Sequence, residues 1–276
     1  MALKLMYITN NPDIALVAEA AGVDRIFVDM EHIGKSRRQG GMDTVQNCHT
    51  LEDLAAIRAV ITHSKVLVRC NPIHEATEQN VGSAEEIDGI VAGGADIIML
   101  PYFKTADEVR TFLELVSGRV RTCLLVETAE AVENIGEILN LPGIDEVFIG
   151  LNDLSLSLGR DFMFEILADG TVEELCRIFK EKGVPYGFGG IASLGRGMLP
   201  AEYIIKEHYR LNSTSVILSR SFCNTNKVTD MRVLRYLFTD GVSQIRRLER
   251  DCATGQVDYL QNSRELRDIV NEIVGK

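Results

Sequence analysis

The sequence has fewer basic than acidic residues and no long hydrophobic run. It contains 29 lysines and arginines against 40 aspartates and glutamates, which gives a formal net charge of -11. Binding to duplex nucleic acid or to an anionic membrane depends on neutralising phosphates with basic side chains, so this balance argues against both partners. No apolar stretch approaches the length of a membrane span, and the start lacks the pattern of a signal peptide. We therefore expect a cytoplasmic protein.

The sequence also lacks ligand patterns of cysteine and histidine. The six cysteines include no C-x-x-C pair, so we expect reduced side chains that pack in the core rather than bind a metal. Four of the five histidines have no ligand spacing with each other, and roles in loops or at helix ends are expected for them. They are His49, His63, His74 and His208.

Eight short apolar or β-branched runs are present along the chain, with helix signals between most of them. The runs are continuous rather than alternating, which is typical of parallel strands covered on both faces. An open doubly wound sheet would give the same pattern, but eight runs, with polar residues after several of them, favour a (β/α)8 TIM barrel. The runs are 3–8, 25–29, 65–69, 96–100, 122–127, 145–150, 185–189 and 215–218.

The strand pattern stops near residue 225, which suggests two parts. We expect a TIM-barrel catalytic domain over 1–225 and a C-terminal helical extension over 226–276. Apolar residues at helical spacing in 263–276 predict a helix that packs on the barrel or on a neighbouring subunit. The segments 31–49 and 151–170 are longer than short connections require, and such loops usually carry function.

Two carboxylates stand at the ends of consecutive runs. Glu127 closes 122–127, and Asp153 follows 145–150 by three residues, so both belong at the carboxyl ends of adjacent strands, where a barrel keeps its chemistry. Two acidic oxygen ligands without histidine or cysteine suit a hard divalent ion such as Mg²⁺ or Mn²⁺. The alternative is that these acids cap the following helices.

A second group of polar residues ends the second and third runs. Asp29 and His32 form a D-x-x-H pattern in which the carboxylate could orient the imidazole as a general base. Arg69 ends an apolar run, and its planar fork suits a carboxylate or an enolate oxygen. The alternatives are a structural Asp29–His32 pair and an internal ion pair between Arg69 and Asp29 or Glu31.

The stretch Gly187–Gly197 follows the seventh run, where many barrels hold phosphate through backbone amides. Gly189 and Gly190 are the candidates there, and Arg220 after the eighth run would complete such a site. The alternative is that the glycines serve only a tight turn.

Five motifs in order resemble the HpcH/HpaI aldolase/citrate lyase family, and the resemblance covers roughly residues 5 to 220. It implies a barrel, a divalent metal (Mg²⁺ or Mn²⁺, with Co²⁺ as a further option) and a class II pyruvate aldolase. Such an enzyme makes or breaks a carbon–carbon bond between a 2-keto acid and an aldehyde. The motifs are Val28–His32, Val68–Arg69, Gly94–Pro101, Val126–Thr128 and Ile144–Ser155.

The resemblance also implies roles for single residues. Glu127 and Asp153 correspond to the metal ligands. Arg69 corresponds to the arginine at the keto oxygen, and Asp29 with His32 to an acid–base dyad that takes the aldol hydroxyl proton, directly or through water. The backbone around Asn152 and Asp153 corresponds to the segment that holds the pyruvate carboxylate.

Further implications concern the partners of the chain. The long 31–49 loop and the segment 207–221 resemble a subgroup associated with polysaccharide biosynthesis, which implies a sugar-derived aldehyde. Family members often form hexamers or trimers of dimers through C-terminal helices, so we expect a homo-oligomer. Two other readings stay open: a lyase acting on citrate or an acyl thioester, and a non-catalytic barrel that binds a sugar phosphate.

Overall fold

Eight parallel strands close into a barrel in which each strand pairs with the next and β8 returns to β1. The computed structural model describes residues 2–34 and 47–275. The strands are β1 (Lys4–Ile8), β2 (Arg25–Asp29), β3 (Lys65–Arg69), β4 (Ile97–Leu100), β5 (Arg121–Val126), β6 (Glu146–Ile149), β7 (Tyr186–Ile191) and β8 (Ser215–Leu218). The predicted TIM barrel is confirmed.

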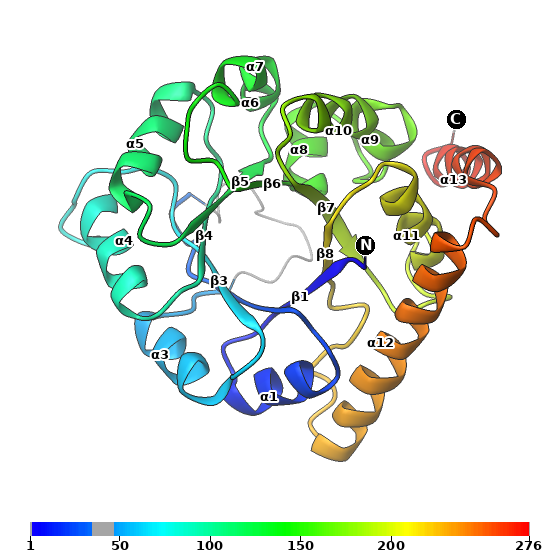
Figure 1. The fold of residues 1–276 in the computed structure, drawn as a ribbon, viewed down its shortest axis with the longest axis horizontal. Coiled ribbons are helices and arrows are strands. Elements are labelled where there is room, and N and C mark those ends of the chain that lie inside the picture. Colours follow the sequence, from blue (N-terminus) through cyan, green and yellow to red (C-terminus); the bar gives the residue numbers. More distant parts are fainter. Residues whose placement is uncertain (1, 35–46, 276) are drawn as a thin grey trace.

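Helices surround the barrel on its outside (Figure 1). Those before residue 140 are α1 (Pro12–Ala20), α3 (Leu51–Val60), α4 (Ser83–Ala92), α5 (Ala106–Val116), α6 (Ala129–Glu133) and α7 (Ile135–Ile138). Those after it are α8 (Leu151–Ser157), α9 (Glu165–Ala168), α10 (Thr171–Glu181), α11 (Ala201–Arg210), α12 (Met231–Ala253) and α13 (Tyr259–Ile273). None of the described helices is both long and apolar enough to cross a bilayer.

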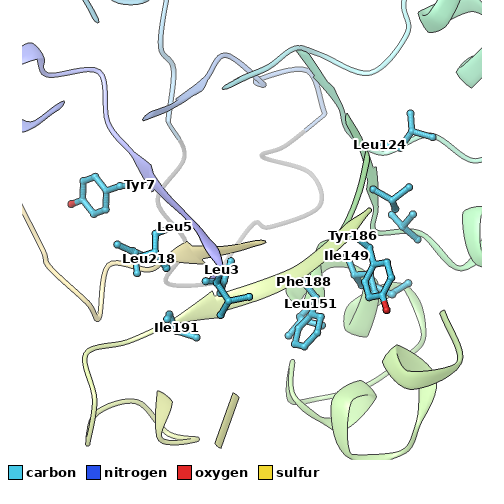
Figure 2. Packing of buried hydrophobic residues seen from close by; sticks show 14 of the residues in the cluster. Leu3, Leu5, Tyr7, Leu124, Ile149, Leu151, Tyr186, Phe188, Ile191 and Leu218 are labelled. Carbon is cyan, nitrogen blue, oxygen red and sulfur yellow. The ribbon is translucent and has the colours of Figure 1, made fainter. Parts of the chain in front are cut away.

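The strands bury side chains on both faces, because successive residues of a strand point to opposite sides. The inward-facing residues fill the barrel with one small cluster: Met6, Phe27, Leu67, Ile97, Met99, Cys123, Leu125 and Phe148. The outward-facing residues join the helices in a much larger cluster. Figure 2 shows part of this outer layer, with Leu3, Leu5 and Tyr7 along the start of the chain and Phe188 and Ile191 along β7. This two-sided burial explains the continuous apolar runs.

The C-terminal helices complete the outer layer on one side of the barrel. The long helix α12 packs against α1 and α11, and α13 packs against α11 and α9 (Figure 1). Leu266 and Val270 of α13 are buried. The predicted apolar stripe of the last helix is therefore buried on the barrel's own helices.

A buried histidine in the outer layer makes stability depend on pH. The ring of His208 stacks on Phe188 with centroids 3.8 Å apart, its Nδ1 lies 2.8 Å from Ser213 Oγ, and its Nε2 has no partner among the described residues. Burial lowers the pKa of His208 to about 3. The neutral ring thus contributes stability that is complete above the unfolded-state pKa of about 6.5 and is lost as the pH falls toward 3.

We expect this group to lower the free energy of unfolding by on the order of 2 kcal/mol between pH 7 and pH 5. Urea unfolding at the two pH values measures the change, and His208→Gln is the control because it has no titrating ring. The pH dependence should be smaller in the variant by about that amount. Equal pH dependence in the two proteins would contradict the assignment.

Candidate active site

A cavity of about 520 Å³ opens at the carboxyl-terminal rim of the barrel. Parallel strands bring all their carboxyl ends to this rim, so residues far apart in sequence line the same space. Most of the residues singled out from the sequence are among those that line it: Asp29, Arg69, Glu127, Asn152, Asp153, Gly189, Gly190 and Arg220. Glu31 and His32 are not among the described residues that line it.

Glu127 and Asp153 come from neighbouring strands, because β5 pairs with β6. Glu127 directly follows β5, is 2% exposed, and its Oε1 accepts a hydrogen bond of 2.9 Å from the backbone N–H of Tyr102. Asp153 lies in the first turn of α8, where Asn152 Nδ2 donates to its Oδ1 at 3.1 Å. The helix-capping alternative does not hold for Glu127, since the Thr128 side chain caps α6.

These two acids fit a hard divalent cation by the chemistry of their donors. Both residues line one cavity, and the described residues contain no group of three or more acidic, histidine or cysteine side chains that could hold a metal. Gly150 packs against the first of them, since a Cβ there would stand only 3.0 Å from Glu127 Oε2. A cation with two protein carboxylates keeps its other coordination positions for substrate and water, as is usual for Mg²⁺.

Arg69 is held rigidly by two buried acids. Its Nε and Nη2 each donate to Asp29 at 2.8 Å, and its Nη1 lies 3.4 Å from Glu31 Oε2. Burial by itself lowers the pKa of Arg69, but the charges of Asp29 and Glu31 outweigh it and raise the pKa above its ordinary value. The internal ion pair foreseen from the sequence therefore forms, and it fixes a permanently charged fork against the cavity.

His32 does not meet Asp29 in this structure. Its Nδ1 lies 3.1 Å from Met30 O, its Nε2 lies 2.9 Å from Asn80 Oδ1, and the residue is exposed. The Met30 N–H still bonds to Arg69 O just past β2. Along such a strand, side chains two apart point the same way and those three apart point opposite ways. Asp29 and Glu31 accordingly both face Arg69, whereas His32 turns outward.

Another histidine lies beside Asp29. His49 lines the cavity, and its Nδ1 accepts a hydrogen bond of 2.9 Å from the backbone N–H of Asp29. The backbone N–H of His49 donates in turn to Asp29 O at 3.1 Å. Asn47 Nδ2 also donates to Asp29 Oδ2 at 3.1 Å. The sequence assigned His49 only a loop or helix-end role. The one signal in the sequence for a role at the cavity was its position just before the helix that follows the second strand.

The far side of the cavity is built from β7, β8 and the start of the chain. Gly189 has a φ of +58°, and a Cβ there would meet Leu151 Cδ1 at 2.6 Å, so both its backbone and its packing require glycine. Polar side chains line this side, and the sequence pointed to Arg220 and its neighbour Ser219 among them. They are Thr9, Asn10, Ser219, Arg220, Asn224, Thr225 and Asn226.

Comparison with known proteins adds independent findings. Residues 4–163 match the model of the HpcH/HpaI aldolase/citrate lyase family. A hydroxypyruvate/pyruvate aldolase of Sagittula stellata is 28% identical over 178 residues, covering 53% of this chain and 61% of that protein. A 2-keto-3-deoxy-L-rhamnonate aldolase of Escherichia coli is 28% identical over 176 residues, covering 53% and 58%. The matches thus span about 60% of the length of these relatives.

Solved structures share the fold. The HpcH/HpaI aldolase of Desulfitobacterium hafniense superposes with a TM-score of 0.60 at 19% identity, covering 89% of this chain and 93% of that one. Citrate synthase SbnG superposes with a TM-score of 0.57 at 18% identity, covering 89% and 94%. The ordered motifs, the closed barrel and the match over residues 4–163 agree, and the chain belongs to the HpcH/HpaI aldolase/citrate lyase family.

Proposed function

We propose that this protein is a metal-dependent aldolase-type lyase that makes or breaks a carbon–carbon bond next to pyruvate or a similar 2-keto acid. The observation that carries the proposal is the meeting of Glu127, Asp153 and Arg69 in one cavity at the carboxyl ends of the strands. Two carboxylates that can hold a cation and a fixed guanidinium are the groups that enolate chemistry needs. The relatives named as aldolases support the same class of reaction.

Glu127 and Asp153 are the residues that would hold the divalent metal, Mg²⁺ or Mn²⁺, with Co²⁺ as a further option. When bound, the metal would act as a Lewis acid that polarises the keto group of the substrate. The Tyr102 N–H fixes the Glu127 carboxylate before any ligand arrives. The backbone at Asn152 and Asp153 starts α8, and we assign it the substrate carboxylate.

Arg69 would hold the keto oxygen as negative charge develops on it. Its bidentate contact with Asp29 fixes the plane of the fork, so little reorganisation is needed during the reaction. His32 could take the aldol hydroxyl proton only after its ring leaves Met30 O and Asn80 Oδ1. In the conformation described, the D-x-x-H dyad is not assembled.

The aldehyde partner would occupy the polar side of the cavity. Asn10, Ser219, Asn224 and Arg220 line that side and offer amide, hydroxyl and guanidinium groups. These groups hydrogen-bond well to the hydroxyls of a polyhydroxylated aldehyde, which supports a sugar-derived partner. Arg220 also suits an anionic substituent such as a phosphate, for which Gly189 and Gly190 would supply the adjacent backbone.

We further propose a cytoplasmic homo-oligomer, a hexamer or a trimer of dimers, with the barrel domain ending near residue 225. Large apolar side chains on the C-terminal helices support association, since Tyr236 is 67% exposed, Leu260 68% and Val233 44%.

Solvent exchange of the pyruvate methyl protons tests the proposed reaction directly. We expect exchange in D2O, followed by NMR, to require added Mg²⁺ or Mn²⁺ and to stop when EDTA removes the metal. The physical reason is that methyl exchange needs the same enolate as bond cleavage. Exchange that is absent with every divalent metal tested would contradict the proposal and favour a non-catalytic barrel.

A further inference from the structure

We infer that His49 is a positioning residue of the active site, acting through Asp29 on Arg69. This inference rests on the function proposed above. It starts from two observations. His32 turns outward, whereas His49 lines the cavity and contacts Asp29, the residue that was expected to orient His32.

The hydrogen bonds of His49 define its chemical state. The backbone N–H of Asp29 can only donate, so the Nδ1 that it contacts must accept and carries no proton. The neutral ring therefore carries its proton on Nε2. His49 also directly precedes Thr50, the N-cap of α3, and the positive end of a helix disfavours an imidazolium there. The residue is thus a fixed acceptor toward Asp29 and not a proton carrier.

The contacts tie the end of β2 to the start of α3 in both directions. Asp29 N–H donates to the His49 ring, and the His49 N–H donates back to Asp29 O. Asn47 of the same segment donates to the Asp29 carboxylate. Asp29 is fully buried, so its N–H needs an acceptor, and removing the ring takes away the acceptor that the structure gives it. The backbone of Asp29 would then shift.

A shift of Asp29 reaches the substrate through Arg69. Both oxygens of Asp29 are used in the bidentate contact at 2.8 Å, so the fork follows the carboxylate. A displacement of about 1 Å in a group that orients a reacting atom can cost on the order of 100-fold in rate. The role of His49 is therefore expected in kcat more than in the affinity for the metal.

Three substitutions separate the two nitrogens of the ring. Asparagine places Oδ1 near the position of Nδ1 and so keeps an acceptor for the Asp29 N–H. Glutamine reaches the position of Nε2 but has no acceptor at the position of Nδ1. Leucine has a polar group at neither position. We expect His49→Leu and His49→Gln to lower kcat for pyruvate methyl exchange by about 10- to 100-fold, with KM changed by less than about threefold. His49→Asn should stay within about threefold of the parent. His63→Leu, at an exposed histidine outside the cavity, is the matched control.

The outcomes distinguish this inference from the proposed function. Parental activity in His49→Leu, or equal damage in His49→Asn and His49→Leu, would overturn the positioning role while the enzyme reaction stands. Absence of metal-dependent exchange in the parent would instead refute the reaction itself. Nitrogen-15 NMR gives a readout that does not use activity: we expect the Nε2–H tautomer for His49, and the Nδ1–H tautomer would also overturn the inference.

Discussion

We expect Glu127→Gln to lower metal-dependent exchange of the pyruvate methyl protons by about 100-fold or more. Glutamine keeps an oxygen that can accept from the Tyr102 N–H, so the fold around β5 is retained. It removes the negative charge, however, and a neutral amide is a much weaker ligand for a hard divalent cation. The metal concentration for half-maximal exchange should rise as the maximal rate falls.

Glu130→Gln is the matched control for this experiment. Glu130 lies three positions further along, on α6, and is not among the described residues that line the cavity; its carboxylate pairs with Lys104, and the two side chains are 46% and 40% exposed. The same chemical change there should leave both the rate and the metal dependence within about twofold, because exposed ion pairs contribute little. Parental rates and parental metal dependence in Glu127→Gln would show that the carboxylate does not hold the metal.

The barrel and most of the cavity follow from features that are local in sequence. Each strand buries both faces, so it appears as a continuous apolar run, and a polar residue that closes such a run must lie at the carboxyl rim. This is why Arg69 and Glu127 could be placed from the sequence. Their convergence needed only the closure of the barrel, which the number of runs predicted.

The position of His32 shows where local reasoning stops. A D-x-x-H pattern gives the spacing of two residues but not the backbone conformation between them. The His32 ring contacts Met30 O and Asn80 Oδ1 instead of Asp29, and Glu31 takes the place beside Arg69. The contact of His49 with Asp29 spans twenty positions in the chain, a separation that no short motif encodes.

The opposite end of the barrel holds an ion pair that the sequence did not predict. Arg25 starts β2 and Glu146 starts β6, and the two are 121 positions apart in the chain. Their side chains meet in a bidentate contact, with Nη1–Oε1 at 2.5 Å and Nη2–Oε2 at 2.8 Å, and only 4% and 5% of them are exposed. The pair closes the core below Met6, whose sulfur lies 3.9 Å from Arg25 Nη1.

Removing one partner of this pair leaves a buried charge. We expect Arg25→Met to lower the free energy of unfolding by about 3 kcal/mol, because Glu146 then loses its bidentate counter-ion and keeps only Arg121, whose Nη2 lies 4.0 Å from Oε2 and whose side chain is 49% exposed. Denaturant unfolding followed by circular dichroism measures the loss. The double variant Arg25→Met, Glu146→Leu should recover most of it, since an apolar pair of similar size needs no compensation.

Arg177→Met supplies the comparison at the surface. Arg177 pairs with Glu174 and Glu181 on α10, but its side chain is 53% exposed, so we expect a change below about 1 kcal/mol. Each substitution removes a bidentate contact between an arginine and a carboxylate. A difference between their effects on stability therefore isolates burial as the cause. If Arg25→Met and Arg177→Met had equal effects, the buried pair would not be what stabilises the amino-terminal end of the barrel. The structure implies a division in which the charges at the carboxyl-terminal rim serve catalysis and the Arg25–Glu146 pair at the opposite end serves stability. Equal effects would contradict that division.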